Sequence, residues 1–395
     1  MVVGLRDLDL RVLLISTSSG STGGGEYYLA SLAIGLQRLG MKVTLIINTH
    51  EDMDYFYSRF GTQIHIKRLK YTNTYKRKFR VYGASLDRRS IKNWVGIIKS
   101  ESPDIIHLNQ QTLEDGIDIY LAAKDLPIPL VCTTHVPHSA SFLGARFGWI
   151  RDILTEKLFN AGPQNHICVS QKSAETLMAR IPAVSGRNGV HTVFNGVDIP
   201  MRETDVATLQ SELKISNESR VIGMVGRIES QKNPLFSIEM LSALKDPDLV
   251  LLWIGDGSLR EEFLLKAQRL GVADQVRVSG WIHQPSDYFC LFDVFCMPSQ
   301  YEGLPLALLE AMRAGLPVMV NDIDGFRDVI ELEKGGYLLP KGDLQRWVSA
   351  VKQLMQDDTL RLNMGKYNKQ LAEQRYSIDA MSQETASVYD SLITQ

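Results

Sequence analysis

The chain has 395 residues, of which 44% are hydrophobic, and its formal net charge is −2. Because single hydrophobic cores rarely exceed roughly 250–300 residues, this length predicts two domains. The nearly balanced charge gives no reason to expect nucleic-acid binding. Four cysteines without a C-x-x-C pair are too few for a disulfide framework at this length, which favours a reduced, cytoplasmic protein.

The apolar stretches of the sequence are short. None approaches the ~18–20 residues that a transmembrane helix requires. The opening, MVVGLRDLDLRVLLIST, places Arg6 and two aspartates before its apolar run, which is unlike a secretory signal. We therefore expect any contact with a membrane to be peripheral and on its inner face.

Apolar runs alternate with amphipathic segments along the first half of the chain. Residues 26–40 have helical periodicity and end on a glycine. Strands that alternate with helices predict a parallel sheet covered on both faces. The runs that predict strands are residues 11–17, 42–48, 104–109, 129–135 and 166–170.

The same pattern restarts after a polar, turn-rich stretch at residues 195–205, which we interpret as a linker. The second series of predicted strands comprises residues 220–226, 249–255, 276–281, 294–299 and 317–322. The fold class is therefore α/β, with two facing, doubly wound, Rossmann-like domains. Ligands of such sheets bind beyond the carboxyl ends of the strands, which predicts a site in an inter-domain cleft.

One segment, Lys67–Lys92, departs from the neutral average. It carries ten Lys or Arg and a single acid, Asp87, together with four aromatic residues. Most charge runs are solvated surface. The alternative is a patch for anionic lipid or a phosphorylated acceptor, since a basic residue near an anionic membrane contributes ~1 kcal/mol.

Two motifs follow predicted strands and suit phosphate chemistry. GSTGGGE, at residues 20–26, opens a helix whose free amides favour anions, although a flexible turn is the simpler interpretation of glycines alone. In VGRIESQKNP, Arg227 and Lys232 follow a strand with a spacing of five. A guanidinium and an ammonium together suit a diphosphate.

Two further patterns resemble metal sites but do not support one. His135 and His138 end a strand without any further ligand pattern, so His135 is either structural or a contact for a sugar hydroxyl. The acids of NDIDG, residues 321–325, are explained by a turn. We expect no metal.

The stretch PSQYEGLPLALLEAM, residues 298–312, places two carboxylates among apolar residues. Pro305 suits the first position of a helix, so Glu302 should lie in the preceding loop and Glu310 within the helix, ~7.5 Å along its axis. The structural alternative is that Glu310 forms an ion pair with a basic side chain such as Arg313 one turn later.

These motifs together resemble the retaining GT-B glycosyltransferases of family four, whose Glu-(x)7-Glu pattern is matched by Glu302 and Glu310. The resemblance runs in order through GGGE, TTH, VFNGVD, VGRIESQKNP, VSGWI and PSQYEGLPLALLEAMRAGLPV. It implies a first domain at 1–199, a nucleotide-sugar-binding domain at 200–375 and a terminal helix at 376–395 that crosses back. The segment DGFRDVI departs from the family pattern at Arg327 and Asp328.

The resemblance also implies roles for the second domain. Arg227 and Lys232 would bind the diphosphate of the donor, and Glu310 would accept hydrogen bonds from the ribose hydroxyls. Glu302 would face the donor sugar. The backbone around Gly303 and Leu304 would add contacts to the donor.

Further implied contacts are His135 with the donor sugar, Gly24 near the diphosphate, and Trp281 and Ile282 at the nucleobase. The resemblance implies a nucleotide-sugar substrate, no cofactor, no divalent metal, and retention of configuration by front-face attack. We favour a UDP-sugar donor, with GDP-mannose as the alternative. A nucleotide-sugar epimerase and a non-catalytic sugar-nucleotide sensor are the competing functions.

The acceptor, a glycan or a lipid-linked glycan, is expected on the first domain. Two segments are candidates for its site, Lys67–Lys92 and residues 142–159. The second segment would place Phe147, Ile150, Leu154 and Leu158 on one helix face, which core packing explains equally well.

Overall fold

The computed structural model describes residues 10–17, 23–49, 64–162, 165–185, 189–198 and 205–394. The chain divides into two compact units. Met1–Gly196 and Ile378–Gln395 form the first, and Val197–Ser377 forms the second. The boundaries predicted from the sequence lie three residues later and two residues earlier, respectively.

The first unit contains a seven-stranded, fully parallel sheet in the order β3-β2-β1-β4-β5-β6-β7. In its centre, Val12 of β1 lies opposite Val43 of β2 and Ile105 of β4. The strands are β1 (Arg11–Ser16), β2 (Lys42–Asn48), β3 (His65–Leu69), β4 (Ile105–Gln110), β5 (Leu130–Thr134), β6 (Asn165–Cys168) and β7 (Val190–Thr192).

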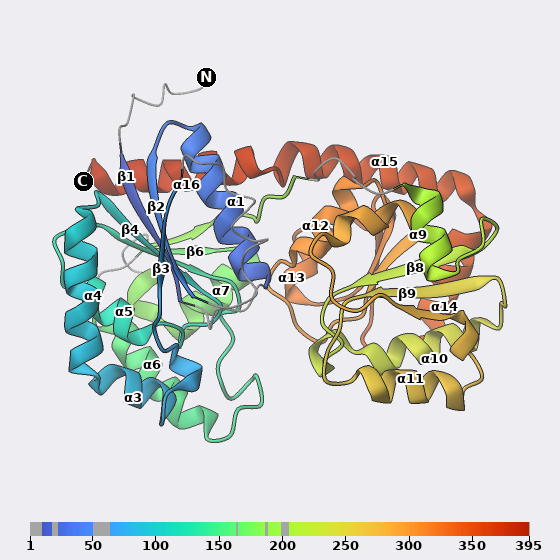
Figure 1. Ribbon diagram of the computed structural model, residues 1–395, viewed down its shortest axis with the longest axis horizontal. Helices are drawn as coiled ribbons and strands as arrows, with labels where there is room; N and C mark the ends of the chain where they lie inside the picture. The colour runs from blue at the N-terminus through green and yellow to red at the C-terminus, as the bar shows by residue number, and fades with distance from the viewer. Residues whose placement is uncertain are drawn as a thin grey trace. The chain divides into compact units, whose positions relative to one another are not determined.

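Helices cover both faces of this sheet (Figure 1). Val12 and Leu14 of β1 enter one core with α1 and α16, whereas Leu13 and Ile15 enter the other with α4 and α5. The helices are α1 (Gly24–Arg38), η1 (Thr74–Lys76), α3 (Arg80–Leu86), α4 (Arg88–Glu101), α5 (Ile117–Ala123), α6 (Gly148–Asn160), α7 (Gln171–Arg180), α8 (Pro182–Ser185) and α16 (Ile378–Ile393).

The second unit contains a six-stranded parallel sheet in the order β10-β9-β8-β11-β12-β13. Its strands are β8 (Arg220–Val225), β9 (Leu249–Ile254), β10 (Val276–Val278), β11 (Val294–Met297), β12 (Val318–Asn321) and β13 (Gly336–Leu339). Its helices are α9 (Val206–Leu213), η2 (Ser230–Lys232), α10 (Pro234–Leu244), α11 (Arg260–Arg269), η3 (Ala273–Gln275), η4 (Pro285–Leu291), α12 (Leu306–Arg313), α13 (Asp324–Arg327), α14 (Leu344–Gln356) and α15 (Asp358–Arg375).

The ten predicted strands are confirmed, with ends that differ by at most three residues. Three strands were missed, β3, β7 and β13. The sequence of β3, HIKRL, has the polar character of an edge strand, and β7 has only three residues. The linker predicted at 195–205 lies partly outside the described residues, which omit 199–204.

The described residues contain neither a membrane-spanning helix nor a disulfide. Within the described ranges, no helix combines the length and apolarity needed to cross a bilayer. All four cysteines are free thiols, three of them buried.

Close packing of α1 against α16 depends on one residue without a side chain. A Cβ atom at Gly35 of α1 would lie 1.8 Å from Oγ and 2.8 Å from Cβ of Ser382 in α16. Both atoms belong to a short side chain on a buried helix face, so they cannot move away freely. Gly35 therefore determines how closely the terminal helix approaches the first unit.

We predict that Gly35→Ala destabilises the first unit by ~1–3 kcal/mol, because overpacking outweighs the better helix propensity of alanine. The measurement is thermal unfolding of the full chain. Gly96→Ala in α4, where an added Cβ meets no atom within 4 Å, is the matched control and should leave stability unchanged or slightly higher. Ser382→Gly in the Gly35→Ala background should restore the midpoint, and absence of rescue would contradict this account.

Candidate functional site

In the second unit, the loops after β8 and β11 come together at the carboxyl edge of the sheet. These strands are neighbours, so residues that follow them emerge side by side. Lys232 Nζ donates a hydrogen bond of 2.6 Å to Glu302 Oε1. Their side chains are only 15% and 8% exposed. The structure thus brings together two of the predicted site residues as a nearly buried ion pair.

Backbone contacts hold these two loops to each other. The amide of Gln300 donates to the carbonyl of Gln231 over 2.8 Å, and Gln231 Nε2 donates to the carbonyl of Tyr301 over 3.1 Å. Lys341 Nζ donates to the carbonyl of Gln300 over 2.5 Å. The position of Glu302 is therefore determined by its loop as well as by its partner Lys232.

The end of β12 and the start of α13 support the same loop. Asn321 Nδ2 donates to the carbonyls of Pro298 and Ser299 over 2.8 and 3.0 Å. A Cβ atom at Gly325 would lie 2.0 Å from the carbonyl oxygen of Gly303, so only glycine permits this approach. The turn after Glu302 is thereby packed against the start of α13.

The two acids of the NDIDG motif face a cation of their own segment. Arg327 Nε pairs with Asp322 over 2.6 Å and its Nη1 lies 3.5 Å from Asp324. The hydrogen bond from Arg327 lowers the pKa of the Asp322 carboxyl. Arg327, a departure from the family pattern, thus accounts for both acids.

Arg227 lies at the edge of the same site on an exposed position. Its side chain makes no hydrogen bond or ion pair with any residue that the structure describes. The following Glu229 accepts hydrogen bonds from the amide and hydroxyl of Ser258, at 2.8 and 2.7 Å, and these bonds lower its pKa. Glu229 therefore fixes the loop that carries Arg227, while the guanidinium stays available for a ligand.

Glu310 lies on α12, as predicted, and is partly exposed among buried neighbours. Gly303 and Leu304 are buried just before the helix. Pro305 is the N-cap rather than the first helical residue, because its extended ψ of 132° precedes the first helical turn at Leu306.

Arg313, the predicted alternative partner of Glu310, lies 3.8 Å from Asp198. Arg313 therefore has an ion-pair partner other than Glu310.

The two residues proposed for the nucleobase follow β10. Trp281 is exposed and packs edge-on against His283, with ring centroids 4.2 Å apart. Ile282 is partly buried. An exposed indole beside a strand end offers a flat apolar surface to a ligand.

In the first unit, His135 follows β5 and is connected to the glycine-rich helix start. His135 Nε2 lies 2.8 Å from Asn109 Oδ1, and Asn109 Nδ2 donates to the carbonyl of Gly25 over 2.9 Å. The carbonyl can only accept, so the amide group of Asn109 faces Gly25 and its oxygen faces the histidine. His135 accordingly carries its proton on Nε2 and keeps Nδ1 as an acceptor.

Burial keeps His135 neutral, since it lowers the pKa of the imidazole to about 4. Beneath it, His107 contacts the hydroxyls of Tyr389 and Thr133 over 2.5 and 2.7 Å, and Tyr28 contacts Thr133 over 3.1 Å. Burial lowers the pKa of His107 to about 3. This polar network connects α16, the sheet and α1 under the predicted site residue.

Gly24 is the first residue of α1 and is exposed. The carboxylate of Glu26 accepts a hydrogen bond of 3.1 Å from the amide of Gly23, which satisfies one of the free amides at the helix start. Residues 20–22 of the motif lie outside the described residues.

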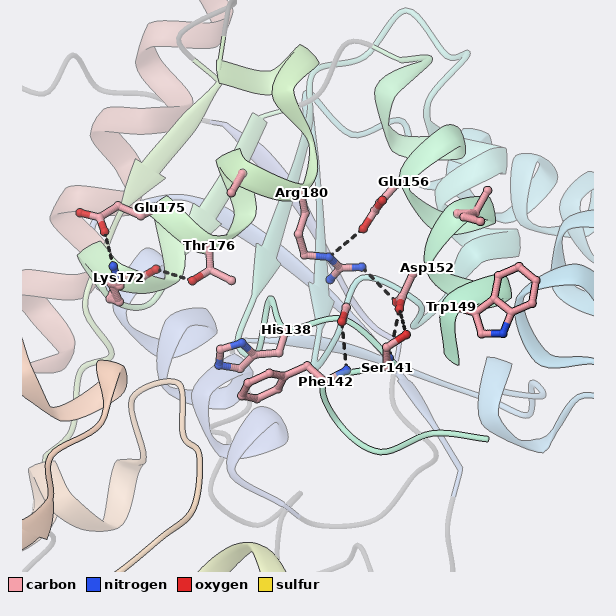
Figure 2. A pocket seen from close by; sticks show the side chains of 13 residues that line it. His138, Ser141, Phe142, Trp149, Asp152, Glu156, Lys172, Glu175, Thr176 and Arg180 are labelled. Carbon is pink, nitrogen blue, oxygen red and sulfur yellow. Dashed lines mark hydrogen bonds and ion pairs between the residues drawn. The ribbon is translucent and has the colours of Figure 1, made fainter. Parts of the chain in front are cut away.

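An open pocket of about 690 Å³ lies on the first unit between the loop after β5, α6 and α7 (Figure 2). Arg180 donates to Glu156 over 3.1 Å and to the carbonyl of Pro137 over 2.5 Å. His138 stacks on Phe142 with centroids 4.2 Å apart. This combination of stacked aromatic rings and carboxylates suits a polyhydroxylated ligand.

The predicted apolar face of residues 142–159 is only partly correct. Leu154 and Leu158 pack against the core, but Phe147 and Ile150 are exposed. Phe147 precedes α6 as its N-cap, so it does not continue the helical face.

Among the described residues, no group of three or more His, Cys, Asp or Glu side chains could hold a metal ion.

Two family models match the chain. Glycosyltransferase Family 4 matches residues 22–199, and glycosyl transferases group 1 matches residues 205–371. This chain is a family-four glycosyltransferase. The resemblance based on the Glu302 and Glu310 motif is thereby confirmed.

Known relatives of this glycosyltransferase include enzymes with different substrates. An *Escherichia coli* UDP-Gal:alpha-D-GlcNAc-diphosphoundecaprenol alpha-1,3-galactosyltransferase is 26% identical over 293 residues, which are 70% of this chain and 72% of that protein. N-acetyl-alpha-D-glucosaminyl L-malate synthase of *Bacillus anthracis* is 25% identical and covers 75% of this chain and 77% of its own length.

Solved structures of the GT-B fold superpose on this glycosyltransferase. *Anabaena* HepE, in complex with UDP-glucose, has a TM-score of 0.79 at 20% identity, covering 97% of this chain and 100% of that one. Sucrose-phosphate synthase of *Thermosynechococcus elongatus* has a TM-score of 0.78 at 17% identity, covering 98% and 99%. At these identities the likeness establishes the fold.

Several residues that shape the candidate site were missed from the sequence. Gln231, Asn321 and Asn109 act through contacts with backbone carbonyls of other segments. A polar side chain near the carboxyl end of a predicted strand was the available signal for Asn109 and Asn321. Nothing in the sequence indicated which carbonyls they bind.

The loop between β4 and α5 holds a buried carboxyl, Asp115. One of its oxygens accepts from the amide of Thr112 over 3.0 Å, and the other has no hydrogen-bond partner within the described part of the chain. Burial raises the pKa of Asp115 to about 7, with a smaller contribution from Glu114. The folded state thus holds this proton more tightly than the unfolded state does.

We predict that titration of Asp115 lowers the free energy of unfolding as pH rises from about 4 towards 7, by at most ~1.4 kcal/mol per pH unit. Above pH 7 this contribution is constant. Asp115→Asn does not titrate, so its stability relative to the wild type should increase over that range. Denaturant unfolding at several pH values measures the difference. Asp125→Asn, at an exposed carboxylate, is the control, and a pH-independent difference for Asp115→Asn would refute the assignment.

Proposed function

We propose that this glycosyltransferase moves a sugar from a UDP-sugar to a glycan or lipid-linked acceptor with retention of configuration. The observation that carries the proposal is the contact between Lys232 and Glu302, with the unpaired guanidinium of Arg227 on the adjoining loop. A cation and a carboxylate at one strand edge suit a diphosphate and the sugar attached to it.

The cations would act on the leaving group. As the bond from the anomeric carbon to the phosphate oxygen breaks, negative charge grows on the departing diphosphate. Fixed donors such as Arg227 and Lys232 stabilise such charge by ~3–4 kcal/mol per good contact, by analogy with oxyanion holes. We propose that they serve this purpose without a divalent metal or a cofactor.

The carboxylates would have separate roles. Glu302 would face the sugar and stabilise its oxocarbenium-like charge. The acceptor oxygen would form the new bond on the same face, and its proton would pass to a phosphate oxygen of the leaving diphosphate. Glu310 would accept hydrogen bonds from the ribose hydroxyls, because α12 holds this partly exposed residue among buried neighbours.

The remaining donor contacts rest on the family resemblance. Trp281 and Ile282 would contact the nucleobase, with Gly303 and Leu304 near the sugar. On the first unit, His135 Nδ1 would accept a hydrogen bond from a hydroxyl of the donor sugar. Gly24, at the exposed start of α1, is proposed near the diphosphate.

The preference for UDP is supported by related proteins. The *E. coli* relative is named as a UDP-Gal-dependent enzyme, and the HepE structures contain UDP or UDP-glucose. GDP-mannose is the alternative donor.

For the acceptor, we propose the pocket lined by His138, Phe142 and Trp149, and a peripheral location on the inner face of a membrane. The *E. coli* relative, whose named acceptor is a diphosphoundecaprenol-linked sugar, supports a lipid-linked acceptor. The proposed anionic-membrane patch in Lys67–Lys92 needs one correction. Arg77 is 11% exposed and pairs with Asp87 and Asp118 over 2.5 Å, so it is structural.

We predict that UDP-sugars stabilise the protein in a thermal-shift panel of UDP-, GDP- and ADP-sugars. At 100 times its dissociation constant, a ligand adds ~2.7 kcal/mol to stability. Stabilisation by GDP-mannose alone would refute the UDP assignment. No stabilisation by any nucleotide sugar would count against donor binding altogether.

We predict that Glu302→Ala and Glu310→Ala impair different steps. Glu302→Ala should lower kcat by about 10²–10³-fold, since it removes charge stabilisation at the reacting sugar. Glu310→Ala should weaken donor binding by roughly tenfold or more through lost hydrogen bonds. Calorimetry with UDP measures donor binding, and steady-state kinetics measure kcat. Glu373→Ala, at an exposed position of α15, is the control. Identical defects in both variants would contradict separate roles.

A further inference from the structure

Exposed hydrophobic side chains are concentrated on two short segments of the first unit. Among the described residues, fifteen large hydrophobic side chains are exposed, and nine of them lie within residues 75–86 and 142–153. These nine are Tyr75, Phe79, Tyr82, Leu86, Phe142, Phe147, Trp149, Ile150 and Ile153. We call them the aromatic surface. Such concentration marks an interaction site, because scattered apolar residues would be ordinary.

The two segments are neighbours in the fold. Residues 75–86 comprise the end of η1 and α3, and residues 142–153 include the first part of α6. Helices α3 and α6 pack against each other, as Figure 1 shows. The exposed side chains therefore come from adjacent elements of one unit.

Both helices begin with an aromatic residue in an unfavourable conformation. Phe79, the N-cap of α3, has φ 61°, and Phe147, the N-cap of α6, has φ 56°. Neither makes a side-chain capping hydrogen bond, yet their side chains are 71% and 61% exposed. Non-glycine residues in this region cost about 1–3 kcal/mol, and asparagine is the better N-cap. These phenylalanines therefore do not serve the stability of their helices.

The charges on the aromatic surface are cations. Lys78 lies 5.6 Å from the ring centroid of Phe79, Arg80 lies 5.2 Å from that of Tyr75, and Arg146 lies 5.2 Å from that of Phe147. None of Lys76, Lys78, Arg80 and Arg146 has an ion pair with a carboxylate in the described ranges.

The single acidic residue within residues 75–86 and 142–153, Asp152, does not add negative charge to the exposed surface. Asp152 is buried and accepts hydrogen bonds from the amides of Ala140 and Ser141. The exposed charge is therefore positive throughout both segments.

Ion pairs of Arg77 and Arg151, two largely buried arginines, hold the two segments in place. Arg77 pairs with Asp87 and Asp118, which fixes the turn before α3. Arg151 of α6 pairs with Glu114 in the loop after β4, with its Nε 3.1 Å from Oε1. The aromatic surface is thus presented on a firm base, which lowers the entropic cost of docking.

We propose that the aromatic surface of α3 and α6 docks on an anionic lipid bilayer, with its aromatic side chains inserted at the headgroup level. Exposed aromatic residues interleaved with unpaired cations match the interfacial region, where rings are partly apolar and the surface potential is negative. This inference deepens the proposed peripheral location and rests on it. It adds insertion by α6 to attraction by the basic segment.

The position of the aromatic surface fits delivery of an acceptor from the bilayer. Phe142, Trp149 and Ile153 belong to the aromatic surface and also line the 690 Å³ pocket shown in Figure 2. A lipid-linked sugar could leave its lipid in the membrane and place its sugar in the pocket.

The test uses the full chain with vesicles of phosphatidylcholine alone and of phosphatidylcholine mixed with phosphatidylglycerol. We expect binding to the anionic vesicles, with Trp149 emission shifted to the blue and quenched by brominated lipid. Trp149 is 62% exposed, so burial would change its environment clearly. The quenched signal should disappear in Trp149→Phe.

The decisive variant is Phe79→Asn with Phe147→Asn. Asparagine tolerates both the left-handed conformation and the N-cap position, so folding should be kept or improved. We expect vesicle binding to fall by at least about tenfold. Leu362→Asn, at an exposed leucine of α15, is the matched control and should bind as the wild type does. Lys76→Glu with Lys78→Glu should abolish the preference for anionic lipid.

Three outcomes would overturn the inference. In the first, the wild type does not bind vesicles. In the second, the asparagine double variant binds vesicles as well as the wild type does. In the third, sedimentation shows a wild-type dimer that is lost in the double variant, and neither protein binds vesicles. Hydrolysis of the UDP-sugar, measured without lipid, should be the same in wild type and double variant. That readout separates failure of membrane docking from failure of the proposed glycosyl transfer.

Discussion

The ion pair between Lys232 and Glu302 connects the two loops on which the candidate site of the second unit depends. Removing both charges from water is costly, so the pair is stable only while each partner is present and held at the right place. Gln231 and Asn321 supply that placement by binding backbone carbonyls of the residues that precede Glu302. A donor diphosphate, as we propose it, would provide Lys232 with a second anionic partner while Glu302 stays positioned by its loop.

The parallel sheets explain why such residues gather where they do. Both faces of each sheet are covered by helices, so side chains along the strands must be apolar and polar groups emerge at the carboxyl ends. Asn109 lies near the carboxyl end of β4, and His135, Arg227 and Glu302 follow strands in this way. In the first unit the same geometry connects His135 through Asn109 to the glycine-rich start of α1.

Stability and surface chemistry are in conflict at the start of α3 and α6. Phe79 and Phe147 occupy N-cap positions where a small polar residue would satisfy the helix, and both adopt left-handed backbone conformations. The surrounding ion pairs of Arg77 and Arg151 keep these turns in place. Natural proteins accept such local costs where a side chain is needed at the surface.

The sequence by itself determined the alternation of strands and helices, the ten strands with continuous apolar runs, and the family through the motif of Glu302 and Glu310. Local pattern and spacing carry that information, because burial within a parallel sheet demands unbroken apolar runs. The sequence did not predict edge strand β3, the burial of Arg77, or the exposure of Phe147 and Ile150. Only the tertiary structure decided these, since each depends on which distant segment packs against the residue and which carbonyl or carboxylate it meets.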